Sequence, residues 1–182
     1  MKKKILSLFV LCVTLITIFS FGFATNVNAA LNGTKWNTRP ITFYATNQLN
    51  ANEISALKSA IAEWNSIGKG TFFTYGGQLG SSIVAVDGKN VVGKSNIPSI
   101  TTLALTNLQY NTSTYVTIEA DISLNSNKNL TGYNMKTIFM HELGHVLGLA
   151  DTDETNSIMH KNYENNKGQI TSYDIADINR LY

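Results

Sequence analysis

The order of the predicted elements indicates an α+β domain in which helices pack on one twisted mixed sheet. Apolar residues recur at helical spacing in three segments, which begin near residues 52, 134 and 171. Several short β-like runs, separated by Gly and Asn, lie between the first and second of these segments. The chain has 182 residues, which is enough for one domain with a proper core but too few for two full-sized domains.

The first 29 residues have the pattern of a secretory signal peptide. Three lysines at positions 2–4 precede an uncharged, mainly apolar run over residues 5–23. Residues 27–29 (Val-Asn-Ala) then place small side chains at the −3 and −1 positions of a cleavage site before Ala30. The alternative is an uncleaved anchor, because the apolar run is about long enough to span a bilayer.

Removing this segment leaves a domain over residues 30–182 and changes its charge. The basic count falls from 14 to 11 while all 12 acidic residues stay, so the net charge moves from +2 to −1. No basic footprint for nucleic acid or an anionic membrane surface remains. The one cysteine, Cys12, is also removed, so the exported domain cannot use disulfides. We expect a secreted monomer, and the Lys-rich signal and Asn-rich chain are typical of a bacterium.

The first part of the domain is predicted to form a strand, then a helix, then further strands. Residues 39–46 place Ile41 and Phe43 on one side, which suits a strand with one buried face. Asn52 can cap a helix that reaches about residue 67 and ends at Gly68. That helix has four apolar positions at helical spacing: Ile54, Leu57, Ile61 and Trp64. Short β-like runs follow at residues 71–75, 82–86, 100–106 and 115–124.

Two more helices complete the prediction. The second runs from about Asn134 to Leu147. The third begins at Thr171 or Ser172, with Asp174 placed as the acid of a capping box. The order of strand, helix, several strands, helix, irregular segment and helix is the basis of the α+β assignment.

The most informative segment lies in the second helix and just after it. His141 and His145 are four residues apart, so they share one helix face about 5.4 Å apart and can both point imidazole nitrogens at one metal ion. Glu142 is rotated by about 100° from His141, which puts it beside such an ion, where a general base is needed. Leu143, Val146 and Leu147 face other directions and can bury the helix in the core. The helix face with the two histidines is then free for chemistry.

A catalytic zinc ion needs a third protein ligand and one open position. Gly148 can adopt a left-handed conformation and end the helix, so that the chain turns back and brings Asp151 to the metal. Two neutral imidazoles and one carboxylate would leave the site near a charge of about +1. Two other candidates for the third ligand stay open at this point, His160 and Glu164, although only Asp151 has the expected offset.

At these residues a family resemblance becomes visible. The segment HELGHVLGLAD at 141–151 resembles the extended zinc signature HExxHxxGxx(H/D) of the metzincin metallopeptidases. Residues 157–160 (Ser-Ile-Met-His) resemble the Met-turn of these enzymes, and residues 170–182 resemble the closing helix of matrixin catalytic domains. The likeness covers most of residues 34–182 and extends to upstream segments: WNTRPITFYAT, the helix with Ala-Glu-Trp at 62–64, and EADISLN.

The resemblance implies a zincin-like domain with about five strands, two long helices and a C-terminal helix after the Met-turn. It implies a secreted zinc endopeptidase with one catalytic zinc ion, bound by His141, His145 and Asp151. Glu142 would be the general base and then the proton donor to the leaving amine. Met159 would be the Met-turn residue, which packs beneath the metal and does not bind it.

The resemblance also suggests how a protein or peptide substrate would bind. The strand around residues 101–106 corresponds to the edge strand of the family, which pairs with an extended substrate backbone. Leu103, Ala104 and Leu105 are therefore candidate substrate contacts. The segment between Met159 and Thr171, which contains Tyr163, is expected to form one wall of the cleft.

Three features depart from the usual matrixin pattern. Most matrixins use His as the third ligand, and Asp151 is the rarer version, seen in snapalysin-like enzymes. No cysteine-bearing propeptide is present, so the cysteine-switch latency of the family is excluded. The histidines of the second, structural zinc site are absent, and no acidic cluster with obvious calcium-loop spacing supports a calcium ion.

Several residues have a structural interpretation beside the functional one. Glu164 follows His145 at the offset of the third ligand in thermolysin-like enzymes, but it lies in a turn-like stretch. Tyr163 could stabilise an oxyanion, as a tyrosine does in astacin-like relatives, although a packing role is favoured. For His160, a hydrogen-bonded or exposed position is favoured. Asp121 and Asn125 are expected to have roles at the sheet edge or in a loop. Trp36 and Trp64 are expected to lie in the core.

Two functional classes follow from this sequence. The first is the secreted zinc endopeptidase. The second is a non-catalytic, zinc-stabilised binding module. Glu142 favours the enzyme, because a purely structural zinc site has no need of an acid there and is normally closed by a fourth protein ligand.

Overall fold

The computed structural model describes residues 31–80 and 87–182 of the chain. The expected signal peptide over residues 1–29 and the β-like run predicted at residues 82–86 lie outside these ranges. Within the described ranges, no helix combines the length and the apolar character that crossing a membrane requires.

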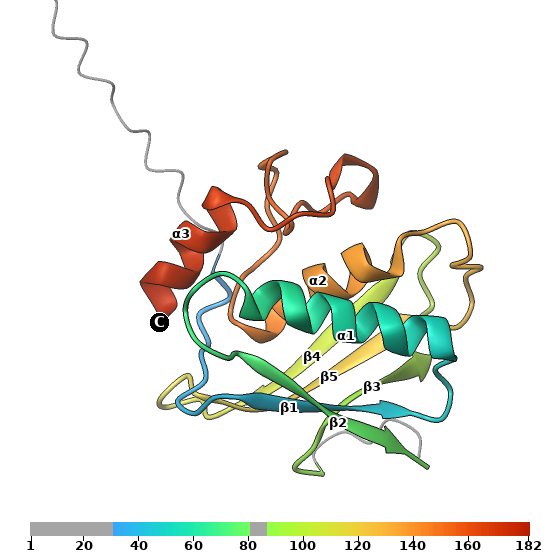
Figure 1. Cartoon of the computed structure of the whole chain (residues 1–182), viewed down its shortest axis with the longest axis horizontal. Helices are drawn as coiled ribbons and strands as arrows, with labels where there is room; N and C mark the ends of the chain where they lie inside the picture. Colours follow the sequence, from blue (N-terminus) through green and yellow to red (C-terminus); the bar gives the residue numbers. More distant parts are fainter. Residues whose placement is uncertain (1–30, 81–86) are drawn as a thin grey trace, which may run out of the picture.

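Five strands form one mixed sheet (Figure 1). The strands are β1 (Ile41–Thr46), β2 (Phe73–Leu79), β3 (Asn90–Ser95), β4 (Ala104–Tyr110) and β5 (Thr117–Asn125). Their order across the sheet is β2-β1-β3-β5-β4, and all neighbours are parallel except β4, which is antiparallel to β5. The strand β4 is therefore one edge of the sheet.

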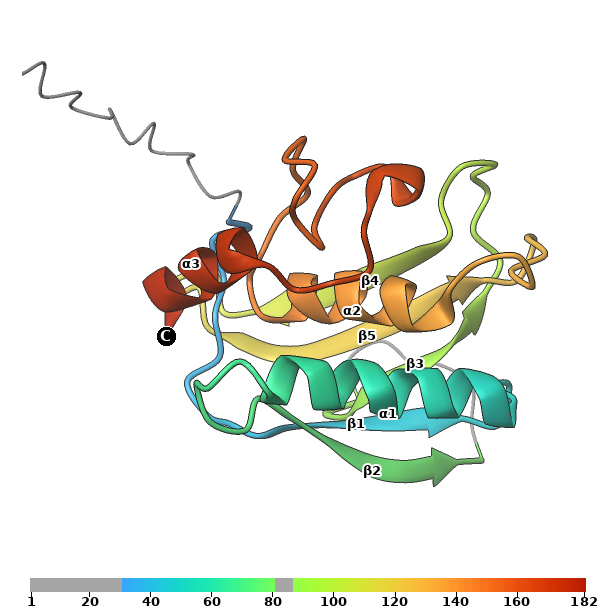
Figure 2. The same cartoon turned by 45° about the horizontal axis from the view of Figure 1, so that its top comes forward.

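Helices α1 (Ala51–Asn65) and α2 (Met135–Val146) lie on one face of this sheet, as Figure 2 shows. A short 3-10 helix, η1 (Tyr163–Asn165), and the C-terminal helix α3 (Ser172–Leu181) follow α2. The structure thus has the predicted α+β architecture, with a mixed five-stranded sheet and three α-helices in the described residues.

Helix α1 begins two residues earlier than the sequence analysis predicted. Its N-cap is Asn50, whose side chain accepts from the backbone N–H of Glu53 at 3.0 Å, while the Glu53 carboxylate accepts from the backbone N–H of Asn50 at 2.8 Å. This reciprocal pair is a capping box. The prediction of Asn52 as the cap was wrong, because only Asn50 has an acidic residue three positions later to complete the pair.

Strand β3 is the one strand of the described sheet that the sequence analysis missed. It contains Val91, Val92 and Gly93, all of which are buried, so its sequence shows no alternation between apolar and polar residues. Such a pattern is typical of a central strand covered on both faces, and β3 indeed lies between β1 and β5. Strand β4 begins later than the predicted run at 100–106, at Ala104.

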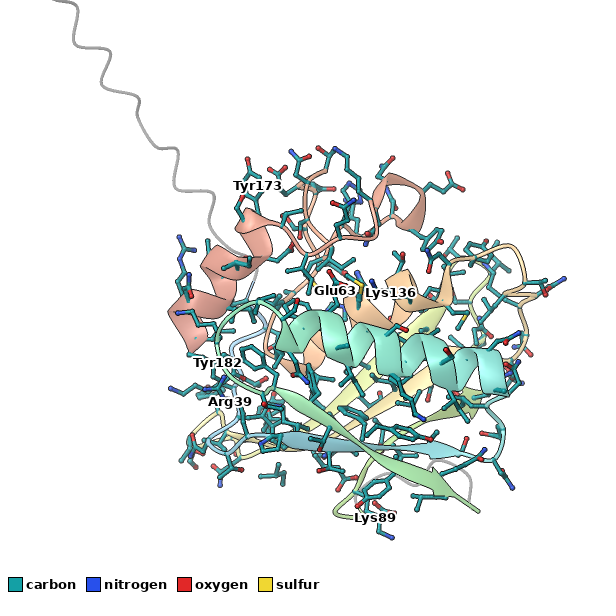
Figure 3. All side chains as sticks on the ribbon, in the orientation of Figure 1. Arg39, Glu63, Lys89, Lys136, Tyr173 and Tyr182 are labelled. Atoms are coloured by element: carbon teal, nitrogen blue, oxygen red, sulfur yellow. The ribbon has the colours of Figure 1, made fainter. Side chains whose placement is uncertain are left out.

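Two tryptophans fix helix α2 in the core, in agreement with the core positions expected for them. The indole N–H of Trp64 donates to the Met140 carbonyl at 2.9 Å, and that of Trp36 donates to the Val146 carbonyl at 2.8 Å. An ion pair of 2.7 Å between Lys136 and Glu63 also joins α2 to α1 (Figure 3). The predicted inward positions of the helix are buried as well: Leu143, Val146 and Leu147.

The C-terminus closes over the end of α2. The Tyr182 hydroxyl donates to the Leu147 carbonyl at 3.1 Å and accepts from the backbone N–H of Trp36 at 3.2 Å. The guanidinium of Arg39 lies 4.8 Å from the centre of the Tyr182 ring (Figure 3). Segments from the two ends of the domain therefore hold the C-terminal end of α2, next to His141 and His145.

Candidate metal centre

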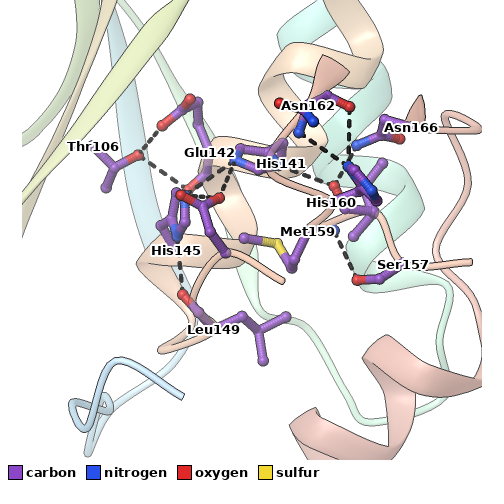
Figure 4. Close-up of polar contacts among 12 residues, drawn as sticks. Thr106, His141, Glu142, His145, Leu149, Ser157, Met159, His160, Asn162 and Asn166 are labelled. Carbon is purple, nitrogen blue, oxygen red and sulfur yellow. Dashed lines mark hydrogen bonds and ion pairs between the residues drawn. The ribbon is translucent and has the colours of Figure 1, made fainter. Parts of the chain in front are cut away.

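Three side chains that can bind a metal converge at the C-terminal half of α2. The Nε2 atoms of His141 and His145 are 3.1 Å apart (Figure 4). A carboxylate oxygen of Asp151 lies 3.1 Å from Nε2 of His141 and 3.5 Å from Nε2 of His145. All the candidate ligand atoms lie within 4.8 Å of one another. The side chains that the sequence analysis grouped are thus brought together.

Gly148 creates the turn that returns the chain to this point. Its φ is +103°, a conformation that favours glycine, as predicted. A Cβ at this position would also overlap the carbonyl oxygen of Thr34. The close approach of Thr34 and the positive φ both require glycine, and together they place Asp151 beside the two histidines.

Backbone carbonyls orient both imidazoles. Nδ1 of His141 lies 3.0 Å from the Ile158 carbonyl oxygen, and Nδ1 of His145 lies 2.9 Å from that of Leu149. A carbonyl oxygen can only accept, so each Nδ1 carries the proton and each Nε2 presents its lone pair to the cluster. Two neutral imidazoles and one carboxylate, with room for a further ligand, are the donor set of a catalytic zinc site. The residues present therefore fit zinc.

The electrostatics of the cluster favour a cation. When Nε2 also carries a proton, hydrogen bonds from His141 and then His145 hold the pKa of Asp151 well below its usual range. Burial lowers the pKa of His145, but the hydrogen bond to Asp151 and the charge of Glu142 outweigh burial, so that this pKa is raised. A metal ion bound here would take the place of the proton that this negative environment attracts.

Glu142 lies beside the cluster and has one specific partner. Its side chain is only 5% exposed, and its Oε2 accepts a hydrogen bond of 2.6 Å from the hydroxyl of Thr106 on β4 (Figure 4). The sequence analysis did not single out Thr106. The two residues are 36 positions apart, and no local pattern connects them.

The segment 157–160 forms a turn next to α2, and Met159 points back toward the helix (Figure 4). Met159 is 2% exposed, and its sulfur lies against Gly144. The Ser157 hydroxyl accepts from the backbone N–H of Met159 at 2.9 Å. Met159 thus packs against α2, and its role as the Met-turn residue stays a prediction.

Asp174 ties this turn to helix α3. It forms the predicted capping box, because its carboxylate accepts from the backbone N–H of Thr171 at 2.7 Å. The same buried carboxylate accepts from the Ser157 hydroxyl at 2.5 Å and from the backbone N–H of Ile158 at 3.1 Å. The second role was missed. The capping pattern was visible, but it carries no information about a partner on a distant turn.

The Asn166 side chain also reaches the metal-facing residues indirectly. Its amide N–H donates to the Ile158 carbonyl at 2.5 Å, the same carbonyl that accepts from Nδ1 of His141. The side-chain oxygen Oδ1 of Asn166 accepts from the backbone N–H of Gly168 at 2.9 Å. Asn166 thus connects the wall segment after the Met-turn to one of the two histidines.

The other candidates lie outside the cluster. Nδ1 of His160 accepts from the backbone N–H of Asn162 at 3.0 Å, and the His160 ring is buried. Glu164 lies on η1 and does not join the three grouped ligand atoms among the described residues. Asn125 donates to the carbonyls of Ser99 and Thr102, and Asp121 accepts from the backbone N–H of Val91. The contacts of His160 and Asn125 agree with the structural roles favoured for them, whereas Asp121 lies on the interior strand β5 and is neither at the sheet edge nor in a loop.

Tyr163 packs at the wall of the site. Its hydroxyl accepts from the backbone N–H of Asn134 at 2.6 Å, and its ring makes an edge-to-face contact of 5.0 Å with Tyr133. Because Asn134 is the N-cap of α2, this contact anchors the segment after the Met-turn to the start of the zinc-facing helix. The hydroxyl and the ring of Tyr163 are therefore both used in structural contacts, which agrees with the packing role favoured for this residue.

An open cleft of about 1100 Å³ runs past the three candidate ligands. Residues 100–106 line one side of it, and residues 160–166 line the other. Leu103, Ala104 and Leu105 are among the lining residues. Within the described part of the chain β4 pairs with β5 alone, so its other edge has no strand partner there.

A zinc-type helix motif, a glycine turn to a third ligand and a methionine turn beside the helix, on a sheet of this topology, define the metzincin class of zinc peptidases. The chain matches the model of the Matrixin family, peptidase family M10, over residues 35–182, and it belongs to that family. It is accordingly a zinc metalloendopeptidase that acts on proteins or peptides, and zinc is its catalytic ion.

One solved structure shows how widely the fold is shared. The chain is similar to High choriolytic enzyme 1, a hatching enzyme zinc-protease from the medaka fish Oryzias latipes, with a TM-score of 0.50. The sequence identity is 15%, and the similarity covers 85% of this chain and 98% of the fish protein. At this identity the likeness concerns the fold alone. No curated protein sequence matches the chain.

Proposed function

We propose that the chain is a secreted endopeptidase in which His141, His145 and Asp151 hold the zinc ion and Glu142 is the general base. The observation that carries this proposal is that the ligand atoms of His141, His145 and Asp151 lie within 4.8 Å of one another. Glu142 follows His141 directly on α2, so its carboxylate lies beside this cluster. Thr106 binds Oε2 of Glu142, and Oε1 has no hydrogen-bond partner among the described residues, which supports a role for this oxygen in proton transfer.

The substrate would bind as an extended strand along the free edge of β4. Antiparallel pairing with the backbone of residues 103–105 would hold the peptide in register and orient its scissile carbonyl toward the histidines. Residues 160–166 would close the cleft on the opposite side. Affinity then comes from main-chain hydrogen bonds, and selectivity comes from the side chains that line the walls.

Bound zinc supplies Lewis acidity, which polarises the scissile carbonyl and makes water a stronger nucleophile at neutral pH. Glu142 accepts a proton from the attacking water and then donates it to the leaving nitrogen, as a general base that becomes a general acid. Its place on α2 keeps the carboxylate next to the histidines throughout. The carbonyls of Ile158 and Leu149 hold the two imidazoles in the tautomer with the proton on Nδ1.

Secretion is a separate part of the proposal and has a direct test. The pattern of residues 1–29 supports export and cleavage before Ala30. Chain recovered from the culture medium of a bacterial host should begin with Ala30 in N-terminal sequencing. Chain that stays with the membrane fraction and keeps residues 1–29 would instead support the uncleaved anchor.

Cleavage of an unfolded protein substrate tests the peptidase activity. We expect purified enzyme to cut internal peptide bonds, to lose this activity with a zinc chelator and to regain it when zinc is restored. Mass spectrometry of the products would identify the bonds. Zinc-loaded protein that cuts no member of a broad panel of unfolded proteins would favour the non-catalytic binding module.

A further inference from the structure

Thr106 lies on the edge strand β4, yet its side chain makes contacts with the zinc-facing helix. It pairs with Ile122 of β5, and its hydroxyl lies 2.6 Å from Oε2 of Glu142 and 3.2 Å from the Glu142 backbone carbonyl (Figure 4). One hydroxyl proton serves one strong bond, so the shorter contact, to the carboxylate, is the principal one. Among the described residues, Glu142 is the one hydrogen-bond partner of this hydroxyl.

This contact restrains a side chain that otherwise has several rotatable bonds. Glu142 has no second side-chain partner among the described residues, and it is only 5% exposed. A hydrogen bond to one carboxylate oxygen fixes the rotation of the group and leaves the other oxygen directed away from Thr106. A proton acceptor with a fixed orientation avoids the loss of rate that a small displacement of a reacting group causes.

We propose that Thr106 is a positioning residue that orients the carboxylate of Glu142, an inference that rests on the proposed role of Glu142 as the general base. Thr106 belongs to the strand along which the substrate is proposed to bind, so one residue couples the base to the strand that holds the peptide. The contact therefore keeps the proton acceptor in register with the scissile bond.

The test uses two substitutions at position 106 and one control. Thr106→Val keeps the shape and the strand preference of the side chain but removes the hydroxyl, whereas Thr106→Ser keeps the hydroxyl. Thr42→Val is the matched control, because it removes a hydroxyl that pairs with the Thr74 hydroxyl at 2.9 Å between β1 and β2. Zinc content, kcat and KM are measured for each zinc-loaded protein.

The expected result is a split between kcat and KM. Thr106→Val should lower kcat by about 10- to 100-fold, the size expected for a lost hydrogen bond to a charged group, with KM changed less than about twofold and zinc content unchanged. Thr106→Ser should recover most of kcat, and Thr42→Val should match the parent. Equal losses in Thr106→Val and Thr106→Ser, unchanged kcat in Thr106→Val, or loss of zinc from Thr106→Val would each overturn the proposal.

Crystal structures of the zinc-loaded parent and of Thr106→Val give a readout that does not depend on activity. The parent should show the Glu142 carboxylate in one orientation, hydrogen bonded to Thr106, and Thr106→Val should show it in a changed or divided orientation. An unchanged single orientation in Thr106→Val would contradict the proposal even if the parent cut no substrate. Absence of cleavage by the parent would count against the proposed function and not against this contact.

Discussion

Gly144 and Met159 are in direct contact next to the two metal-facing histidines. A Cβ built on Gly144 would overlap the sulfur of Met159 and would also come within 3.4 Å of the Trp64 ring. Gly144 lies inside α2, where a glycine normally costs stability relative to alanine. Its presence between Glu142 and His145 is explained by the space that Met159 needs.

Gly144→Ala should therefore destabilise the fold although alanine is the better helix former. We expect a loss of about 1–3 kcal/mol from overpacking, which corresponds to a fall in Tm of about 3–10 °C for a domain of this size. Gly132→Ala is the matched control, because a Cβ there meets nothing within 4 Å. The Tm of both variants is measured by thermal unfolding. Equal Tm values for Gly144→Ala and the parent would contradict the contact between Gly144 and Met159.

The Gly144 and Met159 substitutions should also be coupled. In a Met159→Ala background the sulfur is gone, so Gly144→Ala should cost less than it does alone. Additive losses in the double variant would show that the penalty has another source.

Asp151 and Glu164 can be separated by zinc affinity. Asp151→Ala should weaken zinc binding by more than about 100-fold, beyond the usual effect of losing an outer contact, because it removes a proposed ligand. Glu164→Ala should leave the affinity unchanged, since Glu164 lies on η1 outside the cluster. Competition titration with a coloured chelator measures both, and the reverse ranking would assign the third ligand to Glu164.

Asn166 should affect zinc binding without touching the metal. Its amide holds the Ile158 carbonyl that orients His141, and removal of such an outer contact typically costs about 10- to 100-fold in metal affinity. We expect Asn166→Ala to fall in this range. Its neighbour Asn165 is exposed, and its side chain makes no hydrogen bond to another described residue, so Asn165→Ala is the control. Equal zinc affinities of the two variants would contradict this role.

Asp121 should make stability depend on pH. It lies on the face of β5 opposite the core residues Ala120 and Ile122, and burial, together with the charges of Glu119 and Asp87, raises its pKa to about 6. Because the folded-state pKa is raised, the protonated form favours folding. This contribution is full below about pH 4, the unfolded value, and is lost as the pH rises through about 6.

Asp121→Asn removes this dependence while keeping an oxygen that can accept from the backbone N–H of Val91. The variant should be more stable than the parent at pH 8, by about 1–2 kcal/mol, and close to it at pH 4. Urea denaturation at the two pH values measures the difference. A variant that is less stable at pH 8 would show that the Asp121 charge is stabilised in the fold.

The sequence predicted those parts of the site that depend on local spacing. His141, Glu142 and His145 are related by the helix period, Gly148 follows from the need for a positive φ, and Asp174 was visible as a capping acid. The α+β class followed in the same way from the order of periodic segments.

The remaining parts depend on contacts between distant segments. Thr106 meets Glu142 across 36 positions. The backbone of Ile158 is held by two later segments, because Asn166 donates to its carbonyl and Asp174 accepts from its N–H. Strand β3 lacked a pattern because both of its faces are covered. Such features arise from how the sheet and helices pack, and a single sequence carries no periodic signal for them.

The most direct test of the central claim compares the parent with Glu142→Gln at equal zinc content. Glutamine keeps the size of the side chain and an oxygen that can accept from Thr106, but it cannot take up the proton. We predict that the parent cuts an unfolded protein substrate and that Glu142→Gln loses about 10²- to 10⁴-fold of this activity while it still binds zinc and substrate. Equal cleavage by the two proteins would contradict the assignment of Glu142 as the base and, with it, the mechanism proposed for this site.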